Sequence, residues 1–347
     1  MRILLTGGCG FLGHHICEHL LKNTDADIIV LDKLTYASSG FDRLRDIEAF
    51  DDRRVSILGC DLGQPISPGV AREIGAIDYV IHTAAETHVD NSIADPMPFL
   101  QSNIIGVHHL LWWLRSVPSL RRAFLVSTDE VFGPASLDNK EDKFDEEARF
   151  RPGNPYAATK AGGECLAMAY ANTYGLPITI TSTMNLIGER QSSLDENGRA
   201  IVEKFVPLVT RRVLLGEKIF IHANAARTQS GTRCYLHCRT FAHALHFLID
   251  LDGQPETQRR PIPLKIHVGG EREISNLDLA QMIADIVDRP LLAELTEAPT
   301  NRPGHDIAYR ISDALIQNLG WRRPMGLDQS LKKTVEWYLT NPKWIGL

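Results

Sequence analysis

The sequence predicts an α/β fold built on a doubly wound parallel sheet, with a smaller α/β lobe formed by the C-terminal part of the chain. Two observations lead to this prediction. Short apolar runs alternate with helical patterns over the first half of the 347 residues, and strands that alternate with helices form parallel sheets covered on both faces. A glycine-rich turn also joins the first apolar run to the first helical pattern. The length allows one large domain with a smaller attached part.

The predicted elements follow one another in a regular order. Residues 2–6 form a strand, residues 7–13 a glycine-rich turn, and residues 14–22 a helix with apolar side chains at helical spacing. Further predicted strands lie at 28–31, 55–58, 77–82, 123–128 and 178–184, and the main helices between them lie at 98–115 and 157–173. We therefore expect a first domain over residues 1–185.

The sequence changes character after about residue 185. Segment 189–200 is polar and contains Asn197-Gly198, which is a loop signal. Helical patterns follow at 201–215, 238–250 and 276–288, and a polar surface connection at 250–262. We expect residues 186–347 to form mainly a lobe that closes over the end of the sheet, with some segments returning to the first domain.

The composition argues against several classes of function. Lys and Arg number 37 and Asp and Glu 43, a net charge of −6, whereas binding to nucleic acid needs a basic face. No apolar run approaches the roughly 20 residues that span a bilayer, and residues 1–7 lack the shape of a cleavable signal. Six scattered cysteines suit neither a disulfide framework nor a zinc site. We expect a cytoplasmic protein with no membrane, nucleic-acid or metal partner.

A dinucleotide site is predicted at the first turn. Residues 6–13 read Thr-Gly-Gly-Cys-Gly-Phe-Leu-Gly between a strand and a helix, where glycines permit a tight turn and close approach to a pyrophosphate. Asp32 follows Gly13 by nineteen residues, and a carboxylate there binds ribose hydroxyls and repels a 2′-phosphate. The pattern predicts a Rossmann-type site for NAD rather than NADP. Asp61 and Leu62 could contact the adenine, with a plain turn as the alternative.

A redox pair is predicted at the start of the helix at 157–173. Tyr156 and Lys160 are one helical turn apart, so both face one way. A nearby ammonium should lower the pKa of the tyrosine, which could then take a hydroxyl proton while hydride leaves the same carbon. Lys160 could also hold the nicotinamide ribose. The alternative for such a pair alone is a surface helix without function.

Two carboxyl groups follow the predicted strand at 123–128. Thr128, Asp129 and Glu130 stand at the carboxyl end of that strand, where ligands bind in parallel sheets. Two carboxyls in one site can be driven to different protonation states, one an acid and one a base. A polar turn or helix cap is the alternative.

The chain resembles the extended short-chain dehydrogenase/reductase superfamily and, within it, the nucleotide-sugar 4,6-dehydratases, above all the dTDP-glucose 4,6-dehydratase family. Motifs typical of the superfamily are residues 6–13 and Asn-Pro-Tyr-Ala-Ala-Thr-Lys-Ala (154–161). More specific to the dehydratases are Leu-Asp-Lys-Leu-Thr-Tyr-Ala (31–37), Ala-Ala-Glu-Thr-His-Val-Asp-Asn-Ser-Ile (84–93) and Ser-Thr-Asp-Glu-Val-Phe-Gly (127–133). Asn-Arg-Pro-Gly-His-Asp (301–306) also matches.

The resemblance implies three steps in one closed site. Tyr156 deprotonates the sugar 4-hydroxyl, which Thr128 hydrogen-bonds, while hydride passes from C4 to NAD. Glu130 removes the C5 proton, which the 4-keto group has made acidic, and protonated Asp129 assists departure of the C6 hydroxyl as water. Hydride then returns to C6, giving the 4-keto-6-deoxy sugar, and the cofactor stays bound throughout.

The resemblance also implies further contacts with the cofactor and the nucleotide sugar. The cofactor set comprises Gly7, Gly10, Phe11, Leu12, Gly13, Asp32, Lys33, Thr35, Ala37, Asp61, Leu62, Thr83, Ala84, Ala85, Asn103, Ser127, Tyr156 and Lys160. The substrate set comprises Thr87, Thr128, Asn185, Glu203, Lys204, Phe205, Arg233 and Arg302. Guanidinium suits a diphosphate, and a surface ion pair is the alternative for each arginine.

The departures from the family pattern lie in the C-terminal lobe. The usual Asn-Tyr-Gly-Pro reads Asn-Leu-Ile-Gly at 185–188, and an additional polar loop covers about 192–200. The usual Arg-Asp-Trp-Leu-Tyr-Val-Glu-Asp reads Arg-Cys-Tyr-Leu-His-Cys-Arg-Thr at 233–240, so that Arg239 replaces an acid. Arg272 stands where an asparagine is expected. These changes leave open which nucleotide and which hexose bind.

Two other functions remain open. One is a 4-epimerase or uronate decarboxylase of the same fold, since epimerases need only the Tyr/Lys chemistry and decarboxylases generally lack an acid at position 129. The other is a non-catalytic NAD-bound scaffold, against which the retention of every catalytic residue type argues.

A homodimer is also expected. Superfamily members commonly dimerise through a four-helix bundle of the helices that here lie near 98–115 and 157–173. The apolar cluster at 110–113 fits such an interface, and internal packing is the alternative.

Overall fold

A seven-stranded parallel sheet forms the centre of the molecule, as the predicted fold class requires. The computed structural model describes residues 1–135, 143–224, 226–254, 261–297 and 308–347. The strand order is β12-β6-β5-β4-β1-β2-β3, and every pairing is parallel. The strands are β1 Arg2–Thr6, β2 Asp27–Asp32, β3 Val55–Gly59, β4 Tyr79–His82, β5 Arg122–Thr128, β6 Ile178–Thr183 and β12 Lys265–Val268. The first six confirm the predicted strands, whereas β12 was not predicted.

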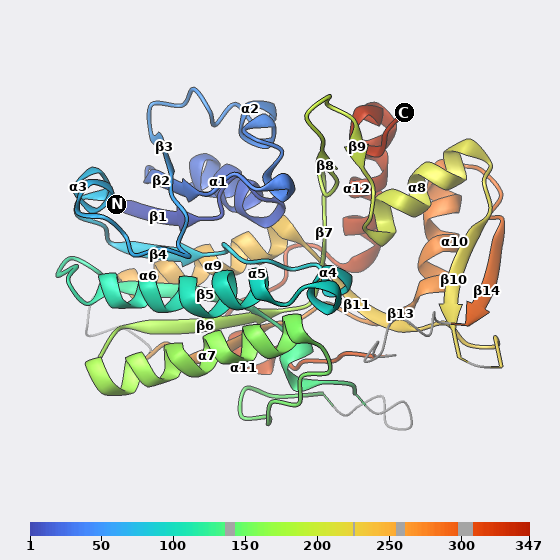
Figure 1. Cartoon of the computed structure of the whole chain (residues 1–347). Helices are drawn as coiled ribbons and strands as arrows, with labels where there is room; N and C mark the ends of the chain where they lie inside the picture. The colour runs from blue at the N-terminus through green and yellow to red at the C-terminus, as the bar shows by residue number, and fades with distance from the viewer. Residues whose placement is uncertain (136–142, 225, 255–260, 298–307) are drawn as a thin grey trace.

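Helices cover both faces of this sheet (Figure 1). Alternate side chains of a strand point to opposite faces, so Ile3 and Leu5 of β1 join one buried core and Leu4 joins another. The first core contains α1 (Phe11–Asn23) and α9 (Cys238–Gly253), and the second contains α6 (Gly106–Leu114) and α7 (Pro155–Tyr174). The predicted helix at 98–115 is α5 (Met97–Leu100), a π-helical turn η2 (Gln101–Ile105) and α6 in succession.

Short helices complete this part of the molecule. They are η1 Tyr36–Ser38, α2 Asp42–Asp46, α3 Pro68–Ile74, α4 Val89–Ala94, η3 Asp129–Phe132 and α11 Ala314–Asn318.

A smaller lobe, with a core of its own, lies beside the carboxyl ends of the strands. Its helices are α8 Phe205–Leu215, α10 Asn276–Val287 and α12 Leu327–Thr340, followed by the turn η4 Pro342–Ile345. Its strands are β7 Asn185–Ile187, β10 Ile219–Ala223, β11 Thr232–His237, β13 Glu273–Ser275 and β14 Ala293–Glu297, in two small sheets. Helix α9 and strand β12 come after residue 185 in the chain but pack with the large sheet. The domain boundary at residue 185 therefore stays a prediction.

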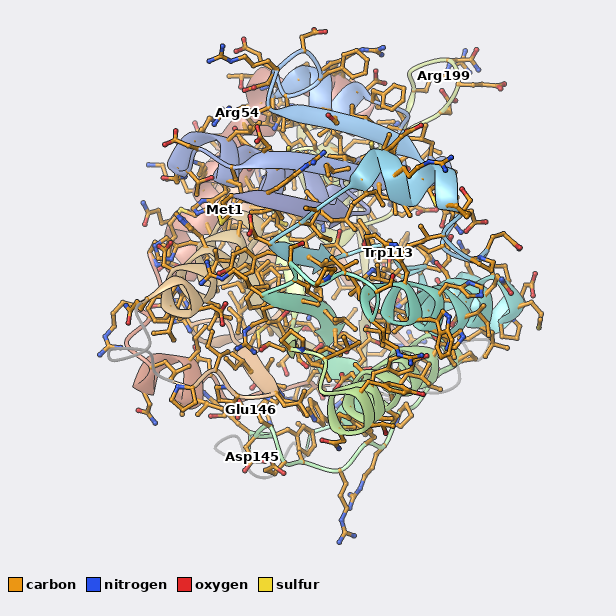
Figure 2. All side chains as sticks on the ribbon, turned by 90° about the vertical axis from the view of Figure 1, so that its left-hand side faces the viewer. Met1, Arg54, Trp113, Asp145, Glu146 and Arg199 are labelled. Carbon is orange, nitrogen blue, oxygen red and sulfur yellow. The ribbon has the colours of Figure 1, made fainter. Side chains whose placement is uncertain are left out.

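A β-hairpin precedes α8, in the region where the sequence predicts a polar loop followed by the start of a helix. Strands β8 (Ser193–Leu194) and β9 (Ala200–Ile201) pair antiparallel, so the helix predicted at 201–215 begins only at Phe205. Asn197-Gly198 forms the turn, with Gly198 at φ +73°, a conformation that favours glycine. Figure 2 shows the side chain of Arg199 pointing away from the body of the molecule at this tip.

Within the described ranges, no helix combines the length and the apolar character needed to cross a bilayer.

Candidate active site

A cavity of about 390 Å³ opens where the carboxyl ends of the central strands meet the smaller lobe. Its walls include the glycine-rich turn after β1, Thr83 after β4, the end of β5, Asn185 after β6, and Glu203 to Val206 before and in α8. A smaller cavity of about 90 Å³ adjoins it beside the end of β2. Ligands bind at this edge of parallel α/β sheets, so the two cavities mark the candidate site.

The glycine-rich turn leaves room for a phosphate group at the N-terminus of α1. Gly7 has φ +72°, and a Cβ added there would lie 2.7 Å from the backbone nitrogen of Ala84. A Cβ at Gly13 would overlap the carbonyl oxygen of Gly7. Phe11 and Leu12, in the first turn of α1, line the larger cavity, and first-turn amides have no acceptor within their own helix. The turn therefore offers N–H groups and a partial positive charge to an anion.

Asp32 is held rigidly at the end of β2. One carboxylate oxygen accepts a hydrogen bond from the Cys9 amide at 3.0 Å and the other from the Leu34 amide at 2.8 Å. Each oxygen keeps a lone pair for a ribose hydroxyl, and Asp32 lines the smaller cavity together with Asp61. The acid and the glycine-rich turn together fit a dinucleotide without a 2′-phosphate, so the residues present suit NAD.

Most of the predicted cofactor residues do line these cavities, and Asn103 is the exception. The Asn103 Oδ1 atom accepts the Glu86 amide at 2.9 Å, and its Nδ2 donates to the Glu86 carbonyl at 2.9 Å and to Thr159 Oγ1 at 3.0 Å. Its hydrogen-bonding groups are thus used inside the protein. The prediction that Asn103 contacts the cofactor stays a prediction, and in this structure Asn103 ties the loop at Glu86 to α7.

The predicted catalytic residues Thr128, Asp129, Glu130, Tyr156 and Lys160 all line the larger cavity. The first three stand where β5 ends and the turn η3 begins. The Thr128 hydroxyl donates to Asp129 Oδ1 at 3.2 Å and accepts the Glu130 amide at 3.4 Å. The first bond holds the Asp129 carboxyl group, and the second fixes the backbone at Glu130.

Asn154 connects Glu130 to helix α7. Its Oδ1 caps the helix by accepting the Ala157 amide at 2.9 Å, while its Nδ2 donates to Glu130 Oε2 at 3.2 Å. The capping side chain therefore fixes Glu130 and the start of the helix that carries Tyr156 together. The sequence reasoning gave Asn154 no role, although it stands in the quoted motif at 154–161.

Asp129 is the buried partner of the carboxyl pair. It is 3% exposed, and within the described ranges its Oδ2 atom has no hydrogen-bond partner. Burial, and next the negative charge of Glu130, raise its pKa from 3.8 to about 7. Two carboxyls in one site cannot both ionise freely, so Asp129 holds a proton at a pH where ordinary aspartates have lost theirs.

Tyr156 and Lys160 face the same cavity, but their electrostatics differ from the prediction. Lys160 Nζ donates to the Val126 carbonyl at 2.7 Å, and burial lowers the pKa of Lys160 to about 8. Burial and the charge of Glu130 raise the pKa of Tyr156 above 10. The predicted lowering of the tyrosine pKa by Lys160 is therefore wrong for the protein alone, because burial of Tyr156 and the charge of Glu130 raise it while the Lys160 ammonium donates to the Val126 carbonyl.

The predicted substrate residues divide into two groups. Thr87, Asn185, Glu203, Lys204 and Phe205 line the larger cavity with Thr128. Arg233 does not line it, since its guanidinium lies over the Tyr309 ring at 5.0 Å and donates to the Thr232 carbonyl. Arg302 lies outside the described residues.

The cavity also has walls that the sequence reasoning missed. They include Tyr36, Arg43, His88, Met184, Leu186, Gln191, Ser192, Ser193, Ile201 and Tyr235. His88 and Glu203 lie 3.5 Å apart, as an Nε2–Oε2 pair joining α4 to the segment before α8. His88 lies in the quoted motif at 84–93, which could have marked it. Tyr36 likewise lies in the quoted motif at 31–37, whereas residues such as Arg43 and Met184 join the cavity wall only through tertiary contacts.

Comparison with known proteins finds sequence similarity to nucleotide-sugar 4,6-dehydratases over nearly the full length of the chain. A family model described as GDP-mannose 4,6 dehydratase matches residues 4–334. The dTDP-glucose 4,6-dehydratase 1 of Escherichia coli K12 is 32% identical over 367 residues, which cover 99% of this chain and 94% of that protein. A trifunctional UDP-glucose 4,6-dehydratase of Arabidopsis thaliana is 32% identical over 346 residues, covering 99% of this chain and 48% of that protein.

Solved structures agree with the sequence matches. The dTDP-glucose 4,6-dehydratase of Streptomyces venezuelae with NAD bound has a TM-score of 0.82 and 30% identity, covering 99% of this chain and 98% of that one. The Bacillus anthracis dTDP-glucose 4,6-dehydratase in complex with NAD has a TM-score of 0.81 and 26% identity at the same coverage. A Bacillus cereus UDP-glucuronic acid 4-epimerase, 22% identical with a TM-score of 0.81, shares the fold.

Proposed function

The chain belongs to the GDP-mannose 4,6-dehydratase family, and we propose that it converts a dTDP- or UDP-glucose-type sugar to the 4-keto-6-deoxy sugar with NAD as cofactor. The full-length relatives named above support this activity. One observation carries it in this chain: Asp129, with its raised pKa, lies beside Glu130 in the cavity that Tyr156 and Lys160 also line. Oxidation and reduction alone would need only the tyrosine and the lysine.

The NAD site is formed by the glycine-rich turn, the first turn of α1 and Asp32. Bound NAD supplies the hydride chemistry, which takes hydride from C4 and gives it back at C6.

Tyr156 is the base for the C4 hydroxyl, and Thr128 donates a hydrogen bond to the same oxygen. Because burial and Glu130 raise the pKa of Tyr156, a base role needs positive charge in the cavity. Lys160 carries one such charge, and oxidised NAD carries another. With the cavity walls excluding bulk water, these charges act at low dielectric and favour the tyrosinate.

Asp129 and Glu130 carry out the loss of water. Once C4 is a ketone, the C5 proton is acidic and Glu130 removes it. Asp129 gives its proton to the C6 oxygen, the C6–O bond breaks, a C5–C6 double bond forms, and water leaves. When hydride is returned to C6, Glu130 gives its proton back to C5, which completes the 4-keto-6-deoxy sugar. Asp129 is buried and has a raised pKa, whereas Glu130 accepts a hydrogen bond from Asn154, and these different surroundings support this division of roles.

A labelled substrate tests the proposal. Incubation with dTDP-glucose or UDP-glucose deuterated at C4 should yield a 4-keto-6-deoxy product with the deuterium at C6, as read by mass spectrometry and NMR. A product with inverted C4 and an intact C6 hydroxyl would show a 4-epimerase instead. Unchanged sugar across a panel of nucleotides would refute the activity.

We also propose that two copies pair through α5–α6 and α7. Leu110 and Leu111 of α6 are fully buried, so they belong to the internal core, but Trp112 is 54% exposed and Met97 62% exposed. Arg115 lies over Trp112 at 4.2 Å and over Tyr174 of α7 at 4.0 Å, which ties the two outer helix faces together. Exposed apolar faces on adjacent helices suit a second copy of the same faces.

Light scattering during gel filtration tests the pairing. The wild type should give a mass of about twice 38.7 kDa, and Trp112→Glu should shift it toward the monomer, because a charge would then be buried at the interface. A wild-type monomer at all concentrations would exclude the homodimer.

We further propose a cytoplasmic location. All six cysteines are free thiols in the structure, as in proteins of reducing compartments. Cell fractionation tests it, and recovery outside the cytoplasmic fraction would contradict it.

A further inference from the structure

The segment between β7 and α8, residues 188–204, crosses the rim of the larger cavity, and we call it the strap. Gln191, Ser192, Ser193 and Ile201 of the strap line the cavity together with the glycine-rich turn. The strap contains the β8–β9 hairpin, which corresponds to the additional polar loop in the sequence. Contacts with α1, α2 and the C-terminal lobe hold the strap at this place.

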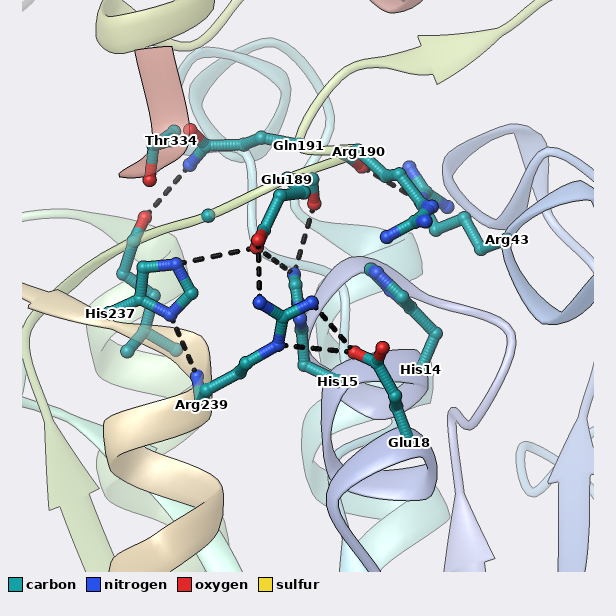
Figure 3. Close-up of polar contacts among 12 residues, drawn as sticks. His14, His15, Glu18, Arg43, Glu189, Arg190, Gln191, His237, Arg239 and Thr334 are labelled. Carbon is teal, nitrogen blue, oxygen red and sulfur yellow. Dashed lines mark hydrogen bonds and ion pairs between the residues drawn. The ribbon is translucent and has the colours of Figure 1, made fainter. Parts of the chain in front are cut away.

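Arg43 joins the strap to the dinucleotide-binding turn. This side chain of α2 is 1% exposed, and all its hydrogen bonds go to backbone carbonyls. Nε donates to Arg190 at 3.0 Å and Nη2 to Ser192 at 2.9 Å, both in the strap. Nη1 donates to Ala37 at 2.7 Å and Ser38 at 2.9 Å in η1, and to Cys9 in the glycine-rich turn at 3.3 Å. Figure 3 shows the bond from Arg43 to the strap.

No acidic side chain of the described residues makes a direct ion pair with Arg43, although the charge of Asp32 acts on it from a longer distance. Among the side chains that the structure describes, no carboxylate lies within about 4 Å of its guanidinium, whereas Arg239 contacts both Glu18 and Glu189. Burial lowers the pKa of Arg43 to about 10, so the group stays charged at neutral pH. A buried charge without a counter-charge is costly. Arg43 also lines the cavity beside the turn that suits a diphosphate.

Other bonds fix the root of the strap to α1 and to the C-terminal lobe. The buried Glu189 carboxylate accepts from Arg239 Nη1 at 2.6 Å, and the Glu189 carbonyl is 3.0 Å from His15 Nε2 of α1 (Figure 3). The Tyr338 hydroxyl donates to the Gly188 carbonyl at 3.2 Å. The first half of the strap is therefore anchored at several points, and Arg43 is the anchor that faces the cofactor cavity.

We propose that Arg43 is a positioning residue for NAD, which fixes the strap over the glycine-rich turn and supplies the counter-charge of the cofactor diphosphate. The strap then slows cofactor release, so that NAD remains bound between turnovers. This inference rests on the NAD dependence of the proposed function, but not on the sugar or on the loss of water.

The test measures the release of NAD from the loaded enzyme, which needs no sugar. Wild type, Arg43→Met and Arg43→Lys are loaded with NAD and diluted into excess isotopically labelled NAD, and the exchange is followed by mass spectrometry. Arg43→Met should release NAD about tenfold faster or more, because two charge-assisted bonds to the strap and the charge are lost. Arg43→Lys keeps the positive charge but loses the planar, forked set of guanidinium donors, so its rate of NAD release should lie between those of the wild type and Arg43→Met.

The control and the salt dependence separate positioning from general damage. Arg45→Met changes an exposed arginine of the same helix and should release NAD like the wild type. Added salt should weaken NAD binding to the wild type more than to Arg43→Met, since screening acts on the missing charge. Equal release rates and equal salt responses in wild type and Arg43→Met would overturn the proposal.

A milder variant covers the case in which Arg43→Met does not fold. Ser39→Ala removes only the hydroxyl that accepts the Leu194 amide of the strap at 2.7 Å, and it should also speed the release of NAD. Unchanged release in both Ser39→Ala and Arg43→Lys would overturn the proposal as well.

Discussion

Replacing Asp129 with Asn should stabilise the protein at neutral and alkaline pH, although it removes a group proposed to act in the reaction. Asn keeps the shape of the protonated acid but cannot ionise. Burial and Glu130 raise the pKa of Asp129 from 3.8 to about 7. A difference of that size between the folded and unfolded states corresponds to about 4 kcal/mol, at 1.36 kcal/mol for each pH unit.

The direction in which stability changes with pH follows from the number of protons bound in the folded and unfolded states. Below about pH 4 both states of the wild type carry the proton, so ionisation of Asp129 costs nothing. Between about pH 4 and pH 7 the unfolded state releases the proton and the folded state keeps it, and stability falls as the pH rises. Above about pH 7 the folded wild type carries the full cost. Asp129→Asn should therefore gain up to about 4 kcal/mol over the wild type there, and little near pH 4.

Urea unfolding of the cofactor-free proteins at a series of pH values measures this difference. Asp51→Asn, at an exposed position, serves as the control and should follow the wild type throughout. A gain for Asp129→Asn that does not change between about pH 4 and pH 8 would refute the reasoning, as would a loss of stability at the alkaline end.

Three further predictions concern Glu130, Lys160 and the ion pair between Arg239 and Glu189. Glu130→Gln removes a charge that raises the pKa of Asp129. The pH at which ionisation of Asp129 appears in the urea-unfolding series should therefore fall below about 7, and an unchanged pH would exclude an electrostatic effect of Glu130 on Asp129. Lys160→Met should slow C4 oxidation about 100-fold or more in a single turnover, read from the absorbance of reduced cofactor, and an unchanged rate would remove Lys160 from the proposed site. Arg239→Met should cost about 3–5 kcal/mol in urea unfolding because it removes the arginine partner of the buried Glu189 carboxylate, and adding Glu189→Gln should restore part of this loss; a double variant no more stable than Arg239→Met would argue against the pair.

Sequence reasoning predicted those features whose cause is local. The glycine-rich turn and the six N-terminal strands of the sheet follow from spacing along the chain, and these strands are confirmed. Asp129 and Glu130 stand directly after a buried strand, so the parallel topology alone brings them to the ligand-binding edge of the sheet. The helical spacing of Tyr156 and Lys160 likewise places both on one cavity wall.

Features that depend on distant contacts were not predictable in this way. Strand β12 (Lys265–Val268) is short and mixes polar with apolar residues, so only its pairing with β6 makes it a strand. Asn103 and Arg233 contact partners that the sequence does not place beside them. Arg43 gains its importance from carbonyls of three separate segments. The pKa of Tyr156 depends on its burial, which no local pattern records.

The central claim is that, between about pH 4 and pH 7, the pair of carboxyls at the end of β5 holds one proton and that Asp129 carries it. Infrared difference spectroscopy of the C=O stretch of a protonated carboxyl tests it most directly. The wild type should show this band at about pH 6 and lose it above about pH 8, Asp129→Asn should lack it, and in Glu130→Gln it should vanish at lower pH. Buried Glu164 also has a raised pKa and can add to this band, so a band of unchanged intensity in Asp129→Asn, or a wild type without any such band at about pH 6, would contradict the account.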